Sequence, residues 1–183
     1  MRYFKKITGE RIYLSPMNKD DAEIYTKWLN DAEVSVNLGQ YAKMITLNNE
    51  QKHLENMTSD GQNFAIVLND DTLIGNISLF EIDSTSRKAT VGLFIGEKEN
   101  RGKGYGTEAL RLILNYGFKT LNLHNIMLQV DSTNEQGIAC YKKVGFREFG
   151  RRREAQYRNG CYIDGVYMDI LDSEFYAAND RKG

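Results

Sequence analysis

The sequence predicts an α/β protein in which helices flank one mixed, mostly antiparallel sheet, and three observations lead to this fold class. Residues 88–95 alternate between two faces, which is the period of a β-strand, with Ala89, Val91, Leu93 and Ile95 on one of them. Thr107–Phe118 is apolar on most sides, as expected for a largely buried helix. The later elements follow the order strand, strand, helix, strand, helix, which suits a single sheet. A chain of 183 residues fits one domain, 1–183.

The first third of the chain predicts one strand and two helices. Arg11–Leu14 is a short strand that ends before Pro16. Asn18 can cap a first helix, whose apolar positions have the helical period and are Ala22, Tyr25, Trp28 and Leu29. We expect Val34–Tyr41 to be irregular. A second helix begins between Thr46 and Asn49 and carries Leu54 and Met57 on one face.

The remaining elements are predicted from alternation and turn residues. Four more strands are expected at Phe64–Leu68, Leu73–Phe80, Phe146–Arg153 and Asp164–Leu171. Asn69-Asp70-Asp71 indicates a hairpin between the first two, and Asn159-Gly160 a tight turn between the last two. Ser84–Arg87 is a polar turn, Ile126–Val130 a strand and Asn134–Val144 a helix. The tail after Ser173 is expected to be polar and partly loose.

Composition excludes several classes of protein. The net charge of −1 argues against a general nucleic-acid-binding surface, which needs a basic excess. The two cysteines imply no disulfide framework, and no metal-binding spacing occurs, so no metal is expected. No apolar run reaches the length of a membrane span, and the first residues lack the apolar core of a signal peptide. We therefore expect a cytoplasmic protein that acts away from membranes.

The most informative segment is the glycine-rich run from Arg101 to Ala109, which leads into the apolar helix. Glycine allows the backbone to approach a ligand closely and to adopt positive φ. A glycine-rich turn at a helix N-terminus directs several backbone N–H groups at one point, which suits a phosphate. The sequence therefore predicts a site for a phosphorylated cofactor.

Two other phosphate-binding motifs fit poorly. A P-loop needs Gly, four residues and then Gly-Lys-Ser/Thr, and no such run occurs. Gly104–Ala109 matches the dinucleotide pattern, but that pattern should follow directly on an early strand. Here Gly96–Arg101 separates it from the strand, and too few residues follow for the rest of a dinucleotide-binding protein.

A second motif lies downstream, where Asn134–Phe146 reads as a helix ended by Gly145. Arg101-x-x-Gly104-x-Gly106, followed by Asn134 and then Tyr141-x-Lys143-x-Gly145-Phe146, resembles the GCN5-related N-acetyltransferase (GNAT) superfamily. Trp28–Asp31 and the segment from Gly117 to Leu123 resemble its branch of ribosomal-protein N-terminal and spermidine acetyltransferases. The resemblance covers about residues 10–172 and implies the GNAT fold, with acetyl-CoA as co-substrate.

The resemblance also implies roles for individual residues. The pyrophosphate of acetyl-CoA would be bound by the loop residues Arg101, Gly102, Lys103, Gly104, Tyr105, Gly106 and Thr107. Backbone groups of Phe94 and Ile95 would contact the pantetheine arm. Asn134 would bind the cofactor, and Tyr141 would be the general acid that protonates the leaving thiolate. These two residues are seven apart, which places both on one helix face about 10 Å apart along the axis.

The general base does not follow from the motif. Many relatives carry a carboxylate on the strand before the loop, but the matching position here is Thr90, which cannot serve as a base. Glu81, Asp83 and Glu33 are the candidate substitutes, acting directly or through water. An acceptor amine of low pKa would react without a dedicated base. Trp28 and Tyr41 flank the irregular segment that would line the acceptor site.

These observations predict an acetyl-CoA-dependent N-acetyltransferase that transfers the acetyl group directly to a primary amine. Neither cysteine has a paired histidine in motif context, so no acyl-enzyme is expected. A non-catalytic acyl-CoA-binding regulatory module is the alternative, because the carboxylate is missing at Thr90. The acceptor could be a protein N-terminus, a polyamine or an amino sugar, and the protein could be a monomer or a homodimer.

Overall fold

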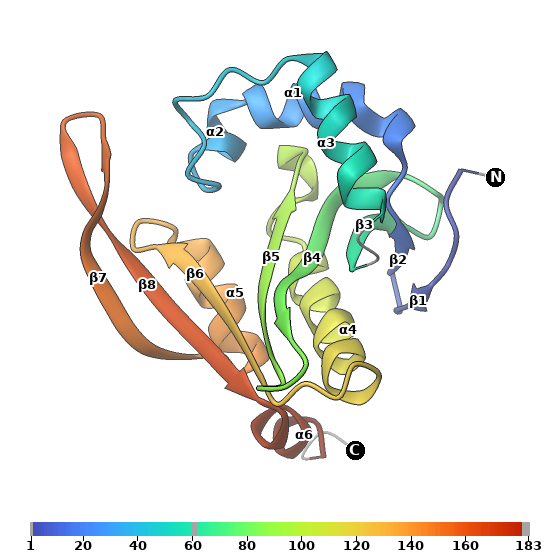
Figure 1. The fold of residues 1–183 in the computed structure, drawn as a ribbon, viewed down its shortest axis with the longest axis vertical. Helices are drawn as coiled ribbons and strands as arrows, with labels where there is room; N and C mark the ends of the chain where they lie inside the picture. Colours follow the sequence, from blue (N-terminus) through green and yellow to red (C-terminus); the bar gives the residue numbers. More distant parts are fainter. Residues whose placement is uncertain (1, 60–61, 181–183) are drawn as a thin grey trace. The chain divides into compact units, whose positions relative to one another are not determined.

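The computed structural model describes residues 2–59 and 62–180 of the chain. They form two compact units. The first contains the residues up to Ser78 together with Leu93–Leu112, and the second contains Leu79–Gly92 together with the residues from Ile113 onward. The strands follow the sheet order β1-β2-β3-β4-β5-β6-β8-β7, so the predicted mixed, mostly antiparallel sheet is confirmed (Figure 1).

The first unit contains an antiparallel series of strands. These are β1 (Ile7–Thr8), β2 (Ile12–Pro16), β3 (Asn63–Leu68) and the first part of β4 (Leu73–Asp83). The predicted hairpin between β3 and β4 is confirmed, and Asp71 adopts the positive φ of 67° that the turn requires. β1 was not predicted, because two residues are too few to show alternation.

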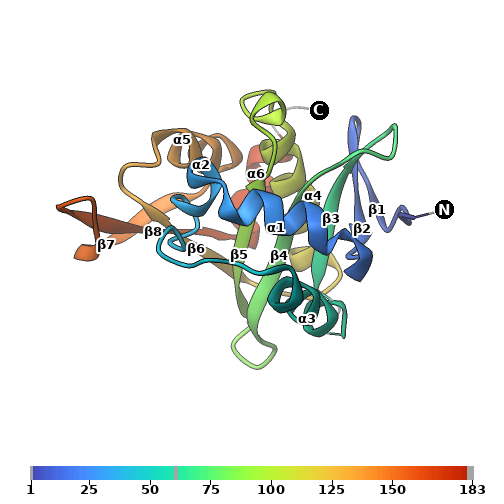
Figure 2. The ribbon, with the colours of Figure 1, turned by 90° about the horizontal axis from the view of Figure 1, so that it is seen from above.

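The helices of the first unit are η1 (Lys19–Asp21), α1 (Ala22–Asn30), α2 (Ala32–Ser35) and α3 (Leu47–Ser59). Asn18 caps the first of them, and α1 buries its four apolar positions as predicted. α1 and α3 lie side by side (Figure 1 and Figure 2). The prediction that Val34–Tyr41 is irregular was wrong at its start, because α2 includes Val34 and Ser35. Asp31 caps this helix, which is too short to show a period.

β5 (Lys88–Ile95) and α4 (Tyr105–Lys119) each contribute residues to both units, with η2 (Lys98–Asn100) between them in the first unit. α4 begins two residues earlier than the predicted start at Thr107, so Gly106 belongs to its first turn.

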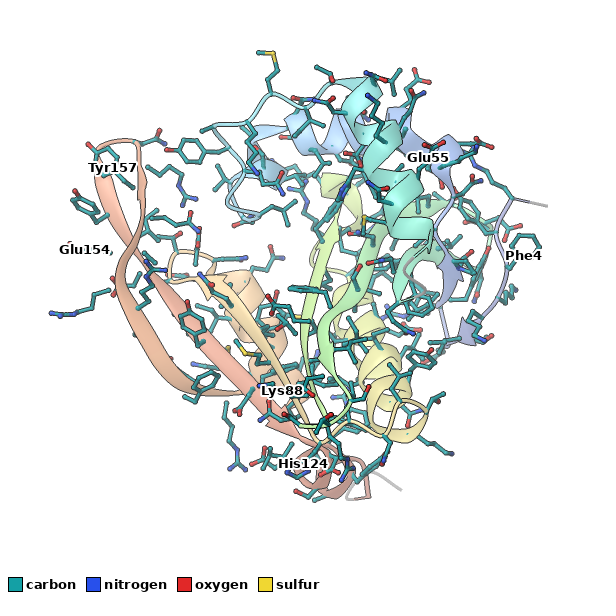
Figure 3. The ribbon with its side chains drawn as sticks, viewed as in Figure 1. Phe4, Glu55, Lys88, His124, Glu154 and Tyr157 are labelled. Carbon is teal, nitrogen blue, oxygen red and sulfur yellow. The ribbon has the colours of Figure 1, made fainter. Side chains whose placement is uncertain are left out.

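The second unit contains β6 (Asn125–Asp131), α5 (Glu135–Val144), β7 (Arg147–Arg158), β8 (Cys161–Leu171) and α6 (Asp172–Asp180). β6 pairs in parallel with β5 and antiparallel with β8. The β7–β8 hairpin is longer than predicted, because pairing resumes at Gln156–Arg158 after an irregularity in β7. Figure 3 labels Glu154 and Tyr157 in this part of β7. Its turn is confirmed, since Asn159 and Gly160 both have positive φ (50° and 82°).

The prediction that the tail after Ser173 is partly loose was wrong for residues 174–180, because they belong to α6; the rest of that tail, residues 181–183, lies outside the described residues. Phe175 is buried, and its ring lies 5.5 Å from that of Phe118. The Glu174 carboxylate accepts a hydrogen bond from the backbone N–H of Leu171 at the start of the helix. One apolar anchor within a polar segment gives little periodicity, which is why the sequence did not predict this helix.

Candidate functional site

The glycine-rich loop has the backbone conformation that its sequence predicts. Gly102 and Gly104 have φ of 73° and 87°, a region that other residues adopt only with strain. The carbonyl of Gly104 accepts the N–H of Glu108 (3.0 Å), which starts α4. The N–H groups at the beginning of a helix have no partner within it and carry its positive partial charge. The loop therefore has the features of an anion-binding helix N-terminus, with Lys103 exposed beside it.

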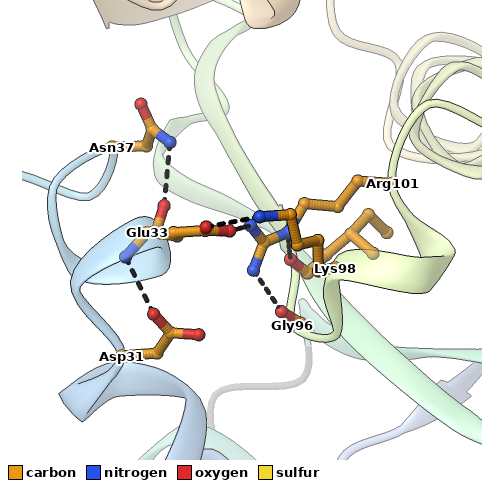
Figure 4. A network of polar contacts seen from close by, with 7 residues as sticks. Asp31, Glu33, Asn37, Gly96, Lys98 and Arg101 are labelled. Carbon is orange, nitrogen blue, oxygen red and sulfur yellow. Dashed lines mark hydrogen bonds and ion pairs between the residues drawn. The ribbon is translucent and has the colours of Figure 1, made fainter.

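Arg101 is occupied by contacts within the protein (Figure 4). Its guanidinium donates to the carbonyls of Ile95 (3.2 Å) and Gly96 (2.5 Å) and to the carboxylate of Glu33 (3.0 Å). Lys98 binds the other oxygen of Glu33 at 2.7 Å. These contacts hold the end of β5 against α2. The contact of Arg101 with the pyrophosphate stays a prediction.

Glu33 is a weaker base than its residue type suggested. The Lys98 ammonium, together with Arg101, holds the pKa of this carboxylate below its usual value. A carboxylate with a lowered pKa has less affinity for a proton, and both of its oxygens already accept hydrogen bonds. Glu33 is therefore better suited to fixing α2 than to activating an amine.

Trp28 lies in the core beneath the end of β5. Its side chain is 1% exposed, its indole N–H donates to Glu97 (2.9 Å), and its ring packs edge-on against Phe94 (6.1 Å). A Cβ at Gly96 would lie 2.1 Å from the indole. Trp28 therefore supports the strand that carries Phe94 and Ile95 and exposes almost no surface to an acceptor. Tyr41, by contrast, is 39% exposed in the segment after α2.

In the second unit, α5 carries both residues that its motif singled out. The Asn134 side chain caps the helix by accepting the N–H of Gly137 (2.9 Å). The ring of Tyr141 packs edge-on against Phe146 (6.0 Å). Burial raises the pKa of the Tyr141 phenol above its ordinary value of 10.0. The phenol therefore stays protonated at neutral pH and can act as a proton donor.

A carboxylate does reach the strand position where the sequence has Thr90. The hydroxyl of Thr90, in β5, donates a hydrogen bond to the carboxylate of Glu81, near the end of β4, at 2.7 Å. Asp83 has a different role, because it accepts the N–H groups of Thr85 and Ser86 (2.9 Å each) and shapes the β4–β5 turn. The Ser86 hydrogen bonds lower the pKa of Asp83. Of the three predicted carboxylates, Glu81 alone contacts Thr90.

The sequence assigned no role to Arg11 or to Glu108, and both lie beside the loop. The Arg11 side chain donates hydrogen bonds to the carbonyl of Lys103 and to the carboxylate of Glu108, which lies in the first turn of α4. These partners are more than 90 residues from Arg11, so no local motif could indicate the contacts.

Two possible features are absent from the described parts of the chain, residues 2–59 and 62–180. They contain no group of three or more His, Cys, Asp or Glu side chains that could hold a metal ion. No helix among them is both long and apolar enough to cross a membrane.

Comparison with known proteins decides the family. A profile described as an acetyltransferase (GNAT) domain matches residues 11–147, which is most of the chain. The chain belongs to the GNAT acetyltransferase family. It is an N-acetyltransferase with the fold that the sequence predicted.

Individual relatives agree with this assignment. The spermidine N(1)-acetyltransferase of Escherichia coli (strain K12) is 29% identical over 96% of this chain and 94% of that protein. A Bacillus subtilis (strain 168) protein named "Putative ribosomal N-acetyltransferase YdaF" is 38% identical, and the match spans 60% of this chain and 59% of that protein. The Vibrio cholerae spermidine N-acetyltransferase, solved in complex with CoA and spermine, has a TM-score of 0.83 at 25% identity, over 92% of this chain and 99% of that chain.

Proposed function

We propose that this enzyme transfers the acetyl group of acetyl-CoA directly to a primary amine. The observation that carries the proposal is the loop Gly102–Thr107, in which two glycines with positive φ lead into the N-terminus of α4. Such a loop suits the pyrophosphate of CoA. Membership of the GNAT family, and the CoA bound to the Vibrio cholerae relative, support the same cofactor.

In the proposed reaction the amine nitrogen attacks the thioester carbonyl carbon, the new C–N bond forms and the C–S bond breaks. Tyr141 donates its proton to the departing sulfur, and its raised pKa keeps that proton available. The amine must be neutral to attack, yet an alkylammonium with a pKa near 10.4 is neutral only about one time in a thousand at pH 7. An alkylamine acceptor therefore needs a base that accepts its proton.

Glu81 is the base that we propose. Its carboxylate accepts a hydrogen bond from Thr90, the position where the family resemblance implies a carboxylate in many relatives, and it is exposed to solvent. It can accept the proton directly or through a water molecule. The alternative of a non-catalytic acyl-CoA-binding module is set aside, because the chain is an N-acetyltransferase by family.

The acceptor belongs to one of three classes of primary amine, a protein N-terminus, a polyamine or an amino sugar. Relatives named for spermidine and for ribosomal substrates support the first two. The sequence has no dense acidic cluster of the kind that would bind a polycation.

Thermal melting with saturating acetyl-CoA tests the cofactor, since a ligand of the native state raises its apparent stability. We expect an upward shift with acetyl-CoA and little change with NADH. A screen of peptides, polyamines and amino sugars, read as release of the CoA thiol, then identifies the acceptor. No shift with acetyl-CoA, or a larger shift with NADH, would exclude this cofactor, and no thiol release with any amine would contradict the reaction.

A further inference from the structure

Arg11, in the turn between β1 and β2, contacts the glycine-rich loop on both sides of Gly104. Its Nη1 donates to the carbonyl of Lys103 at 2.9 Å. Its guanidinium lies over the ring of Tyr105, 5.0 Å from the centroid, in a cation–π arrangement. Its Nη2 lies 3.2 Å from the point that a Cβ at Gly104 would occupy. One side chain thus contacts Lys103 and Tyr105, on either side of Gly104, although Arg11 and Lys103 are 92 residues apart in the sequence.

The contact with Lys103 fixes the direction of a backbone donor. In a trans peptide the C=O of one residue and the N–H of the next point in opposite directions. The described part of the chain contains no cis peptide bond. Because the Lys103 carbonyl points at Arg11, the N–H of Gly104 points away from Arg11. Its positive φ then turns the chain into the first turn of α4.

Glu108 holds Arg11 in this position. One carboxylate oxygen of Glu108 accepts the Nε of Arg11 (3.0 Å), and the other accepts the backbone N–H groups of Glu10 and Arg11 (2.8 Å each). Glu108 also lies in the first turn of α4, where a negative charge is favourable. The guanidinium is therefore fixed at two of its nitrogens by two different partners, a carboxylate and a loop carbonyl.

We infer, on the basis of the function proposed above, that Arg11 is a positioning residue for the pyrophosphate of acetyl-CoA. Arg11 holds the Lys103–Gly104 peptide so that the Gly104 N–H faces the pyrophosphate, and Glu108 holds Arg11. The role requires the forked shape of the guanidinium, because a single ammonium cannot reach both Glu108 and the Lys103 carbonyl with the same geometry.

The test compares two acyl donors in steady-state kinetics, acetyl-CoA and acetylpantetheine, which lacks the pyrophosphate. For Arg11→Met we expect the KM for acetyl-CoA to rise about tenfold, as for the loss of one charge-assisted hydrogen bond. The KM for acetylpantetheine and the kcat should stay within about twofold of wild type. Arg11→Lys should lose as much as Arg11→Met, and Glu108→Gln should lose part of the affinity.

Arg152→Met, which removes one exposed arginine from β7, is the matched control and should leave both KM values unchanged. Melts without ligand confirm that each variant folds. Equal increases in KM for both donors would mean that the substitution disturbs the whole acyl-donor site, and this would overturn the inference. A wild-type KM for acetyl-CoA in Arg11→Lys or in Arg11→Met would overturn it as well. If wild-type protein does not bind acetyl-CoA, the proposed function fails, and this role fails with it. If wild type binds and Arg11→Met binds equally well, only the role of Arg11 fails.

Discussion

Replacing Arg158 with methionine should destabilise the second unit, because it leaves the carboxylate of Asp131 buried beside an apolar side chain. Arg158 and Asp131 form an ion pair at 3.2 Å, and their side chains are 9% and 5% exposed. Arg158 also donates to the hydroxyl of Thr133 (3.2 Å), and Gln156 donates to the other oxygen of Asp131 (2.8 Å). Together these bonds hold the segment that leads to Asn134 and α5.

The size of the effect follows from these contacts. Removing one partner of a buried ion pair costs about 3–5 kcal/mol, because an uncompensated charge stays buried. Gln156 still donates to Asp131 in the variant. We therefore expect a loss near the lower end, about 3 kcal/mol, which for a domain of this size lowers the Tm by about 6–12 °C.

The loss should depend on pH with a defined sign. Burial raises the pKa of Asp131 above its ordinary value, and Arg158 opposes that rise. In the variant the opposing charge is gone, so the folded-state pKa of Asp131 rises further above the unfolded value. The folded variant then binds more protons than the unfolded chain, and its stability increases as the pH falls toward the unfolded pKa near 4. The difference from wild type should therefore shrink on acidification.

The measurement is a set of melts at pH 7 and pH 4.5 for wild type, Arg158→Met and the double variant with Asp131→Asn. The double variant should recover part of the loss, since no charge remains buried. Arg151→Met is the matched control, because the pair of Arg151 with Glu148 is exposed, and it should melt like wild type. An Arg158→Met protein that melts within about 1 °C of wild type at pH 7, or one whose deficit grows on acidification, would refute this reasoning.

Three further substitutions test other features. Tyr141→Phe should lower kcat by about 10²–10⁴-fold with the affinity for acetyl-CoA unchanged, and the wild-type rate should not fall below pH 10 through loss of this proton. Steady-state kinetics across pH measure both effects, with Tyr176→Phe as the control. A Tyr141→Phe enzyme with the wild-type kcat would show that the hydroxyl is not needed. Gly96→Ala should cost about 1–3 kcal/mol in a denaturant titration, because its Cβ meets Trp28, whereas Gly150→Ala, with open space around it, should not. Phe175→Ala should cost about 3–5 kcal/mol in the same titration, and a near-neutral result would show that α6 packs weakly.

Where the sequence predicted the structure well, a short-range physical rule was sufficient. The buried face of α1 follows from the helical period, and the turn at Asn159-Gly160 follows from two positive φ angles that few residues tolerate. The glycines of the loop were recognised for the same reason. Each of these features is decided by residues within a few positions of one another.

The features that the sequence did not reveal depend on contacts between distant segments. Glu81 could be named as a carboxylate, but its bond to Thr90 depends on how β4 ends relative to β5. Arg101 belongs to the recognised motif, but its partner Glu33 lies 68 residues away in the sequence. This ion pair already engages the positive charge of Arg101. Arg11 lies outside every motif. Spacing along the chain carries no information about such pairings.

The contact between Gly96 and Trp28 restricts how this sequence can vary. A Cβ at Gly96 would lie 2.1 Å from the indole, so any other residue there requires a smaller side chain at position 28. A smaller side chain alone would leave a cavity beneath the end of β5. Neither residue can therefore change first without a less stable intermediate. We therefore expect residues 28 and 96 to be substituted together among related sequences. Neither position should accept a substitution on its own.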